Sequence, residues 1–133
     1  MPNTSASILV VEDDAFTLAL LRFVLERQGL QVQTVADGPA ALACIAQGPV
    51  PDAVLLDLLL PQVSGLAVLE RLRQSPAWAQ TPVVVLSALD AGSDLAQAFA
   101  AGASDYVTKP FNPEELLARL QRLLPNNWPT LMA

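Results

Sequence analysis

The sequence contains no histidine, and only one of its 133 residues is a cysteine, Cys44. The missing histidine excludes Ser-His-Asp triads, zinc sites of the HExxH type and a histidine that itself accepts a phosphoryl group. A single cysteine excludes an internal disulfide framework and is typical of a reducing compartment, so we expect a cytoplasmic protein. Any chemistry in this chain must use other side chains.

Basic residues and long apolar runs are also scarce. The chain has 7 Lys and Arg against 13 Asp and Glu, for a net charge of −6, which argues against direct nucleic-acid binding. Apolar runs of about five to eight residues fall far short of the roughly 20 that span a bilayer. The N-terminal MPNTSAS lacks the segments of a signal peptide. We expect no membrane association and no secretory leader.

Apolar residues are abundant, at 53% of the chain against 15% charged residues. This composition is typical of a compact domain rather than a disordered chain, and the length suits one core. We expect one domain over residues 7–124, followed by a tail or linker stub over residues 125–133.

Strand and helix patterns alternate five times along the chain. Apolar or alternating runs predict strands at 7–11, 30–35, 52–57, 81–88 and 104–108. Helices are expected at 15–29, 37–48, 64–74, 93–102 and from a cap at Asn112 to 125. In the first helix, Phe16, Leu20, Phe23 and Val24 fall on one apolar stripe. The alternation predicts a doubly wound, flavodoxin-like (βα)5 fold of class α/β, with a five-stranded parallel sheet in the order 2-1-3-4-5.

Polar side chains follow the predicted strands at their carboxyl ends. Asp57 ends the third strand inside an apolar run, where a carboxylate is costly unless it is used or neutralised. The first and third strands would be neighbours at the switch point, where ligands bind in such sheets. Glu12, Asp13 and Asp14 all follow the first strand. We expect one pocket to contain Asp13, Asp14 and Asp57, with Ser87 and Lys109 on its far side.

These residue types together favour phosphoryl transfer. Three carboxylates repel one another, and a hard divalent cation such as Mg²⁺, or Mn²⁺ as an alternative, relieves that repulsion. A lysine ammonium suits a phosphate oxygen, and a serine hydroxyl can bond another. A carboxylate can itself be the nucleophile, so Asp57 is the predicted phosphoacceptor.

Four stretches, in this order, resemble the receiver domain of bacterial two-component response regulators. They are VVEDD (10–14), LLDLLLPQVSG (55–65), VVVLSA (83–88) and GASDYVTKPF (102–111), and the resemblance covers about residues 7–124. It implies that Asp57 accepts a phosphoryl group from a sensor histidine kinase or a histidine phosphotransfer protein. It also implies that the protein is not an enzyme for other substrates and catalyses only its own phosphorylation and dephosphorylation.

The resemblance assigns a role to each site residue. Asp14 would ligate Mg²⁺ directly, with Asp13 helping, often through water. Asp57 and the main-chain carbonyl of Leu59 would complete the protein ligands. Read from the residues alone, Asp13 or Asp14 could instead cap the first helix.

The remaining assigned roles concern the response to phosphorylation. Ser87 would bond the phosphoryl group and move towards it, while Lys109 would pair with it. The Lys109–Pro110 bond is expected to be cis. Tyr106 would turn inward as a switch, and the face of helix four, strand five and helix five would then change its affinity for a downstream protein.

Two departures from the family pattern bear on behaviour. Leu59 and Leu89 stand two residues after Asp57 and Ser87, at positions that flank the phosphoryl group and tune its rate of loss. Both are apolar, so we expect slow autodephosphorylation. Many DNA-binding regulators of this family dimerise through charged residues on the face of helix four, strand five and helix five. The fourth helix of this chain carries no Lys or Arg, so this set of charges is incomplete and we expect a monomer or weak dimer.

Two other functions are compatible with such a fold. One is a scaffold that binds partners regardless of phosphate, although the complete set of acids with Ser87 and Lys109 speaks against it. The other is a phosphoaspartate hydrolase, but such enzymes usually carry a second aspartate where this chain has Leu59.

Overall fold

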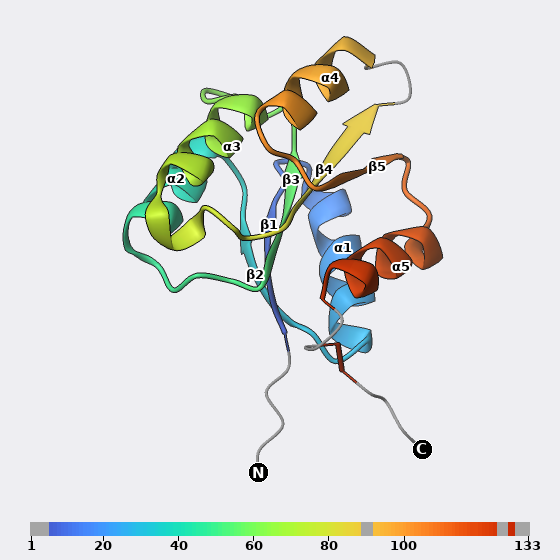
Figure 1. The fold of residues 1–133 in the computed structure, drawn as a ribbon. Helices are drawn as coiled ribbons and strands as arrows, with labels where there is room; N and C mark the ends of the chain where they lie inside the picture. Colours follow the sequence, from blue (N-terminus) through green and yellow to red (C-terminus); the bar gives the residue numbers. More distant parts are fainter. Residues whose placement is uncertain (1–5, 89–91, 125–127, 130–133) are drawn as a thin grey trace.

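The computed structural model describes residues 6–88, 92–124 and 128–129. These form a five-stranded parallel sheet in the order β2-β1-β3-β4-β5, with helices on both faces (Figure 1). The strands are β1 (Ser7–Val11), β2 (Gln31–Val35), β3 (Ala53–Asp57), β4 (Val83–Ala88) and β5 (Asp105–Lys109). The helices are α1 (Ala15–Arg27), α2 (Gly38–Gln47), α3 (Gly65–Gln74), α4 (Gly92–Ala100) and α5 (Pro113–Leu123), with a short 3-10 turn η1 (Pro76–Trp78). The predicted fold class and strand order are confirmed.

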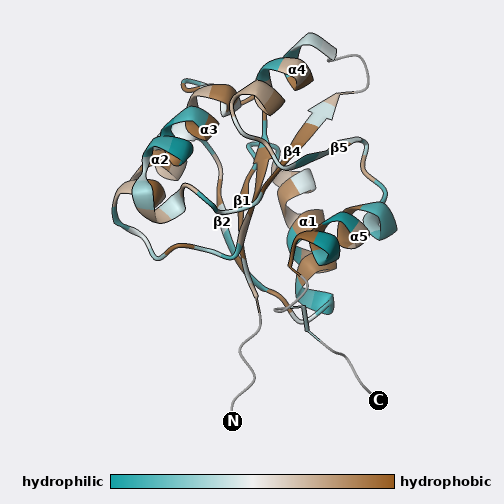
Figure 2. Cartoon of the chain, viewed as in Figure 1, coloured by the Kyte–Doolittle hydropathy of each residue, from teal (hydrophilic) through white to brown (hydrophobic). Residues whose placement is uncertain are grey.

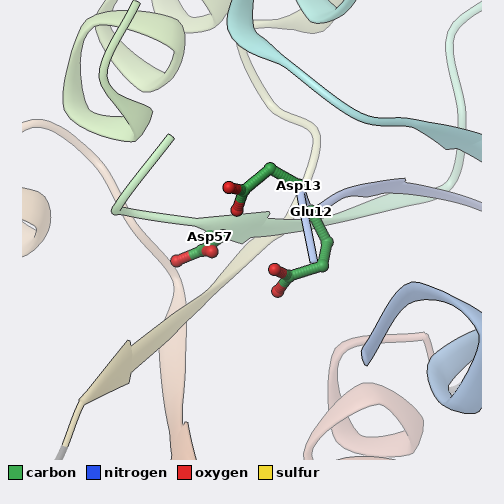
Figure 3. Close-up of side chains that lie close together, drawn as sticks. All are labelled: Glu12, Asp13 and Asp57. Carbon is green, nitrogen blue, oxygen red and sulfur yellow. The ribbon is translucent and has the colours of Figure 1, made fainter. Parts of the chain in front are cut away.

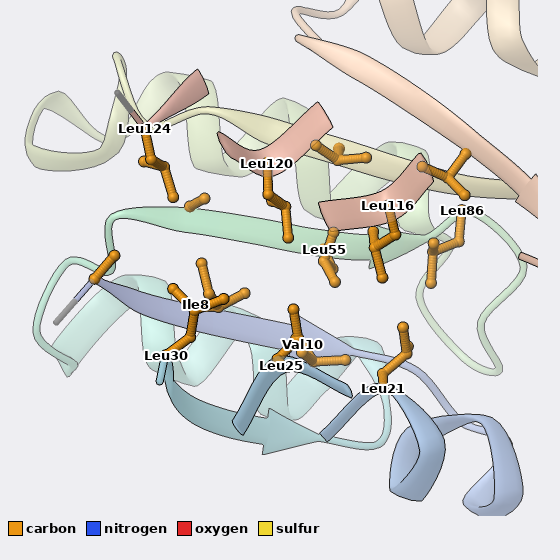
Figure 4. Packing of buried hydrophobic residues seen from close by; sticks show 14 residues of the cluster. Ile8, Val10, Leu21, Leu25, Leu30, Leu55, Leu86, Leu116, Leu120 and Leu124 are labelled. Atoms are coloured by element: carbon orange, nitrogen blue, oxygen red, sulfur yellow. The ribbon is translucent and has the colours of Figure 1, made fainter. Parts of the chain in front are cut away.

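The apolar runs become strands because both faces of the sheet are covered. Every residue of β3 is buried, and β1 and β4 are nearly so. α1 and α5 cover one face, where Val10, Leu25, Leu55 and Leu120 share one core cluster (Figure 4). α2, α3 and α4 cover the other face around Trp78. The central strands are accordingly coloured mostly as hydrophobic in Figure 2.

Helix starts are set by local side chains. Asp37, Ser64 and Asn112 each accept a hydrogen bond from a main-chain N–H in the first turn of the following helix, and Pro113 opens α5. Gly65 brings the start of α3 against the end of β3, where a Cβ atom would clash with the main-chain carbonyl of Asp57. The Ser-Gly pair therefore shapes the surroundings of Asp57.

The apolar stripe predicted for α1 lies largely on the outside of the molecule. Leu21 and Leu25 are the residues of this helix that are fully buried against the sheet. Phe16 is 76% exposed and Phe23 is 58% exposed. Apolar residues occupy more than one face of α1, so their spacing did not reveal which face packs on the sheet.

Some predicted features lie at or beyond the edges of the described residues. Leu89 and residues 125–127 and 130–133 are outside them. Trp128, in the predicted tail, is half-buried and packs against the core cluster between the sheet and α1 and α5. Among the described helices, none combines the length and the apolar character needed to cross a membrane.

Candidate functional site

Three carboxylates meet at the carboxyl ends of β1 and β3. These strands are neighbours, and one carboxylate oxygen from each of Glu12, Asp13 and Asp57 lies within 4.8 Å of the others (Figure 3). Glu12 and Asp57 are 0% and 3% exposed, whereas Asp13 faces solvent. The cluster sits at the topological switch point, where open α/β sheets bind ligands.

Lys109, which ends β5, contacts two of these acids. Its Nζ lies 3.0 Å from both Asp57 Oδ2 and Glu12 Oε1. Burial lowers the pKa of Lys109, but its contacts with Asp57 and Glu12 outweigh burial and raise the pKa above its usual value. The ammonium therefore stays charged at neutral pH. The other Asp57 oxygen, Oδ1, accepts a hydrogen bond of 3.0 Å from the main-chain N–H of Leu59.

Glu12 is the most deeply buried acid of the group. Burial raises the pKa of its carboxyl, and the negative charge of Asp57 adds to the effect, while the Asp14 N–H and Lys109 act against it. Its Oε1 is buried and receives no hydrogen bond of good geometry from the described residues, so its contact with Lys109 is an ion pair. A buried carboxylate oxygen that accepts no hydrogen bond is well suited to bind a cation.

The donor set fits a hard divalent cation. Mg²⁺ prefers oxygen ligands and binds through one or two carboxylates together with water and phosphate. Glu12, Asp13 and Asp57 are the residues that would hold it.

Asp14 does not join this cluster, which corrects the sequence prediction that it ligates the metal directly. Its Oδ2 accepts hydrogen bonds from the Thr17 main-chain N–H at 2.9 Å and the Thr17 hydroxyl at 2.6 Å, and so caps α1. These bonds lower the pKa of the Asp14 carboxyl. Glu12 occupies the place that the prediction gave to Asp14.

Strand alternation is the sequence signal that identifies Glu12. Successive side chains of a strand point to opposite faces, so residues two apart share a face. The residues two before the site residues all belong to the core cluster under α1 and α5: Val10 before Glu12, Leu55 before Asp57 and Val107 before Lys109. The same parity therefore brings these three charged groups together.

Ser87 also reaches this site. It is buried and lines a cavity of about 50 Å³ together with Asp57 and Lys109. Its hydroxyl donates to the carbonyl of Ala88, at 3.2 Å. The Lys109–Pro110 bond is cis, as predicted.

The other predicted residues lie around this centre. The Leu59 side chain is 68% exposed beside Asp57, and the metal-binding role of its carbonyl stays a prediction. Tyr106 on β5 is half-buried and contacts Phe99 and Arg119. A larger hollow, of about 230 Å³ near Val50, is lined by none of the clustered acids.

Comparisons with known proteins agree with this geometry. The family model "Response regulator receiver domain" matches residues 8–121. The transcriptional regulatory protein KdpE of Mycobacterium tuberculosis is 48% identical over 120 residues, which is 90% of this chain and 51% of KdpE. The response regulator PleD of Caulobacter vibrioides is 40% identical over 90% of this chain and 26% of PleD. The chain thus spans about half the length of KdpE and a quarter of PleD.

Two solved structures are also similar. The chemotaxis response regulator CheY4 of Vibrio cholerae has a TM-score of 0.85 and 33% identity, covering 91% of this chain and 100% of that chain. The receiver domain of the sensor histidine kinase PA1611 from Pseudomonas aeruginosa, with a magnesium ion in its active-site cleft, has a TM-score of 0.85 and 30% identity over 92% of this chain and 100% of that chain. With this fold, this acidic cluster and these relatives, the chain belongs to the response regulator receiver domain family of two-component signalling.

Proposed function

We propose that Asp57 takes a phosphoryl group from a phosphohistidine on a sensor histidine kinase or a histidine phosphotransfer protein. The observation that carries the proposal is the buried Asp57 carboxylate, 3.0 Å from Lys109 and clustered with Glu12 and Asp13. A carboxylate held between a cation and a metal-binding pair is suited to forming an aspartyl phosphate.

The chemical step is a displacement at phosphorus. A carboxylate oxygen of Asp57 forms the new O–P bond while the N–P bond to the donor imidazole breaks, and the imidazole leaves with the electron pair. Lys109 stays against the phosphoryl oxygens, and the Ser87 hydroxyl leaves the Ala88 carbonyl to donate to one of them. Bound Mg²⁺, or Mn²⁺, would neutralise the negative charge on the transferring group. The protein catalyses this reaction, and the later hydrolysis of the aspartyl phosphate by water to inorganic phosphate, only on itself.

The phosphodonor has an exposed apolar surface on which to dock. Phe16, Leu20 and Phe111 line a hollow of about 140 Å³ that also includes Lys109. Phe23 extends the exposed apolar surface along α1. Exposed aromatic side chains of this kind are typical of a protein contact. Because this hollow extends to Lys109, which contacts Asp57, we assign this surface to the phosphohistidine-bearing protein.

The output would be a change in protein contacts at the face of α4, β5 and α5. Tyr106 lies in this face and would turn inward as Ser87 moves. We further propose that residues 7–124 act as one cytoplasmic unit, monomeric or weakly dimeric, whose downstream target is a protein.

Phosphorylation by a small donor tests the proposal. The protein is incubated with Mg²⁺ and acetyl phosphate, and its intact mass is compared with that of Asp57→Asn. We expect one added phosphoryl group in the wild type only, and none in either protein after chelation of Mg²⁺. If the wild type gains no phosphoryl group and does not bind beryllium fluoride, the proposal is wrong and a phosphate-independent scaffold is favoured.

A further inference from the structure

Arg119 of α5 contacts two residues of β5, Asp105 and Tyr106. Its Cζ is 5.4 Å from the centroid of the Tyr106 ring, in the range of a cation–π contact. Phe99 of α4 meets the same ring edge-on, with centroids 6.1 Å apart and ring planes at 89°. The ring is therefore in contact with both a cation from α5 and an aromatic side chain from α4.

Arg119 is itself fixed at two points. Its Nη1 lies 2.6 Å from Asp105 Oδ1, and its Nη2 lies 3.1 Å from Glu115 Oε2. Asp105 Oδ1 also accepts a hydrogen bond of 2.8 Å from the main-chain N–H of Tyr106. One carboxylate thus positions both the guanidinium and the residue on which it stacks.

Burial distinguishes this group from an ordinary surface ion pair. The side chains of Arg119 and Asp105 are only 24% and 16% exposed. Arg119 Nε is buried and has no hydrogen-bond partner among the described residues, so the guanidinium is only partly satisfied by its two carboxylates. A planar guanidinium held in this way cannot follow the ring if the ring moves.

We propose that Arg119 is a latch on Tyr106, which stabilises the ring in its present position and opposes activation. The inference rests on the proposed function, in which Tyr106 turns inward after phosphorylation. Turning inward breaks the contacts with Arg119 and Phe99, so these contacts favour the unphosphorylated state. A partly exposed cation–π contact corresponds to a shift of about two- to fivefold in the ratio of the two states.

The single tyrosine of the chain makes the latch directly measurable. Tyr106 is the only tyrosine, so ring-labelled tyrosine gives one NMR signal. The unliganded wild type and the wild type loaded with Mg²⁺ and beryllium fluoride provide the two end positions. Before loading, Arg119→Gln should move the signal towards the loaded position. Its apparent affinity for beryllium fluoride should also rise by about two- to fivefold.

Two further variants keep the test specific. Arg122→Gln removes an exposed arginine three residues further along α5 and should leave the signal and the affinity unchanged. Arg119→Lys keeps the charge but loses the two-point attachment, so a partial shift is expected. If Arg119→Gln does not fold, the Tyr106 signal and the beryllium fluoride affinity of Arg119→Lys are compared with those of the wild type instead.

The outcomes separate the latch from the proposed function. The latch is wrong if the Arg119 variants show the wild-type signal and affinity. It is also wrong if Asp57 becomes phosphorylated while the wild-type Tyr106 signal stays in place, a result that leaves the phosphoacceptor function intact. Failure of Asp57 to take up phosphate in the wild type would overturn both.

Discussion

The Lys109 ammonium and the Asp57 carboxylate lie 3.0 Å apart, although β4 runs between their strands. β4 ends in Ser87 and Ala88, two small residues that line the cavity with them. Among the described residues, Lys109 is the cation that contacts both buried carboxylates, while the main-chain N–H groups of Leu59 and Asp14 donate to Asp57 and Glu12, respectively. The site is therefore built around more negative charge than one lysine neutralises.

Replacing Glu12 with glutamine should weaken Mg²⁺ binding and raise the stability of the folded protein. Burial raises the Glu12 pKa above 4.5, so the folded state holds this proton more tightly than the unfolded state. In chelator, stability therefore falls as the pH rises from about 4.5 through the folded-state pKa. Glu12→Gln removes that loss and should raise the melting temperature at neutral pH. It should weaken Mg²⁺ binding by about tenfold or more, since fewer charged ligands remain.

Calorimetric titration with Mg²⁺ and thermal unfolding across pH 4–8 measure both effects. Glu70→Gln is the matched control, because Glu70 is exposed on α3 away from the acidic cluster. An unchanged Mg²⁺ affinity in Glu12→Gln would remove Glu12 from the metal site.

The sequence predicted the fold and the edge of the sheet that carries the site, but not every residue in it. Strand and helix alternation and the polar residues at the strand ends identified Asp57, Ser87 and Lys109. The assignment failed among the acids after β1, because carboxylates serve equally well as helix caps and as metal ligands. Parity does not separate Glu12 from Asp14, because they are two residues apart; Glu12 directly follows β1 and points to the site, whereas Asp14 directly precedes α1 and caps it.

Other features depend on packing that local patterns do not encode. The apolar stripe of α1 was visible, but which face of α1 packs on the sheet is decided by the docking of Leu21 and Leu25. The stacking of Arg119 on Tyr106 joins two residues of different elements, and the sequence gives no signal for that contact.

Substitution of Asp14 should affect stability, whereas substitution of Asp13 should affect Mg²⁺ binding. Asp14→Ala removes the cap of α1 and should lower the melting temperature by about 2–4 °C, with Mg²⁺ affinity unchanged within about twofold. Asp13→Asn should lower the Mg²⁺ affinity about tenfold and leave the helix cap in place. Thermal unfolding and Mg²⁺ titration of both variants decide between the two assignments. The original assignment of Asp14 as a direct ligand would return if Asp14→Ala lost metal binding.

Phe16 should matter only to a protein phosphodonor. Phe16→Asp places a charge on the exposed apolar surface of α1 and should slow phosphotransfer from a histidine kinase or phosphotransfer protein by about tenfold. Phosphorylation by acetyl phosphate should stay within about twofold of the wild type, because this small donor does not need the surface.

Val50→Asp is the control for this experiment. Val50 is also exposed, at 43%, but it lies beside Ser7 and Gln31 at the amino ends of β1 and β2, away from Asp57. Equal losses with both donors in Phe16→Asp would point to a damaged site rather than a docking surface.

Leu59 should govern how long the phosphoryl group persists. Its side chain is exposed beside Asp57 and cannot hydrogen-bond to an attacking water, whereas its main-chain N–H already donates to Asp57 and is kept in any variant. Leu59→Asn adds a polar group that can orient water, and should speed dephosphorylation roughly tenfold.

Leu59→Ala separates the two ways in which leucine could act. It removes the bulk that shields the acyl phosphate but adds no polar group, so a smaller increase than in Leu59→Asn indicates that orientation of water is the missing element. The decay of the phosphorylated mass with time, in Mg²⁺ and without a donor, gives all three rates. If both variants decay at the wild-type rate, the apolar residue at this position does not set the lifetime of the signal.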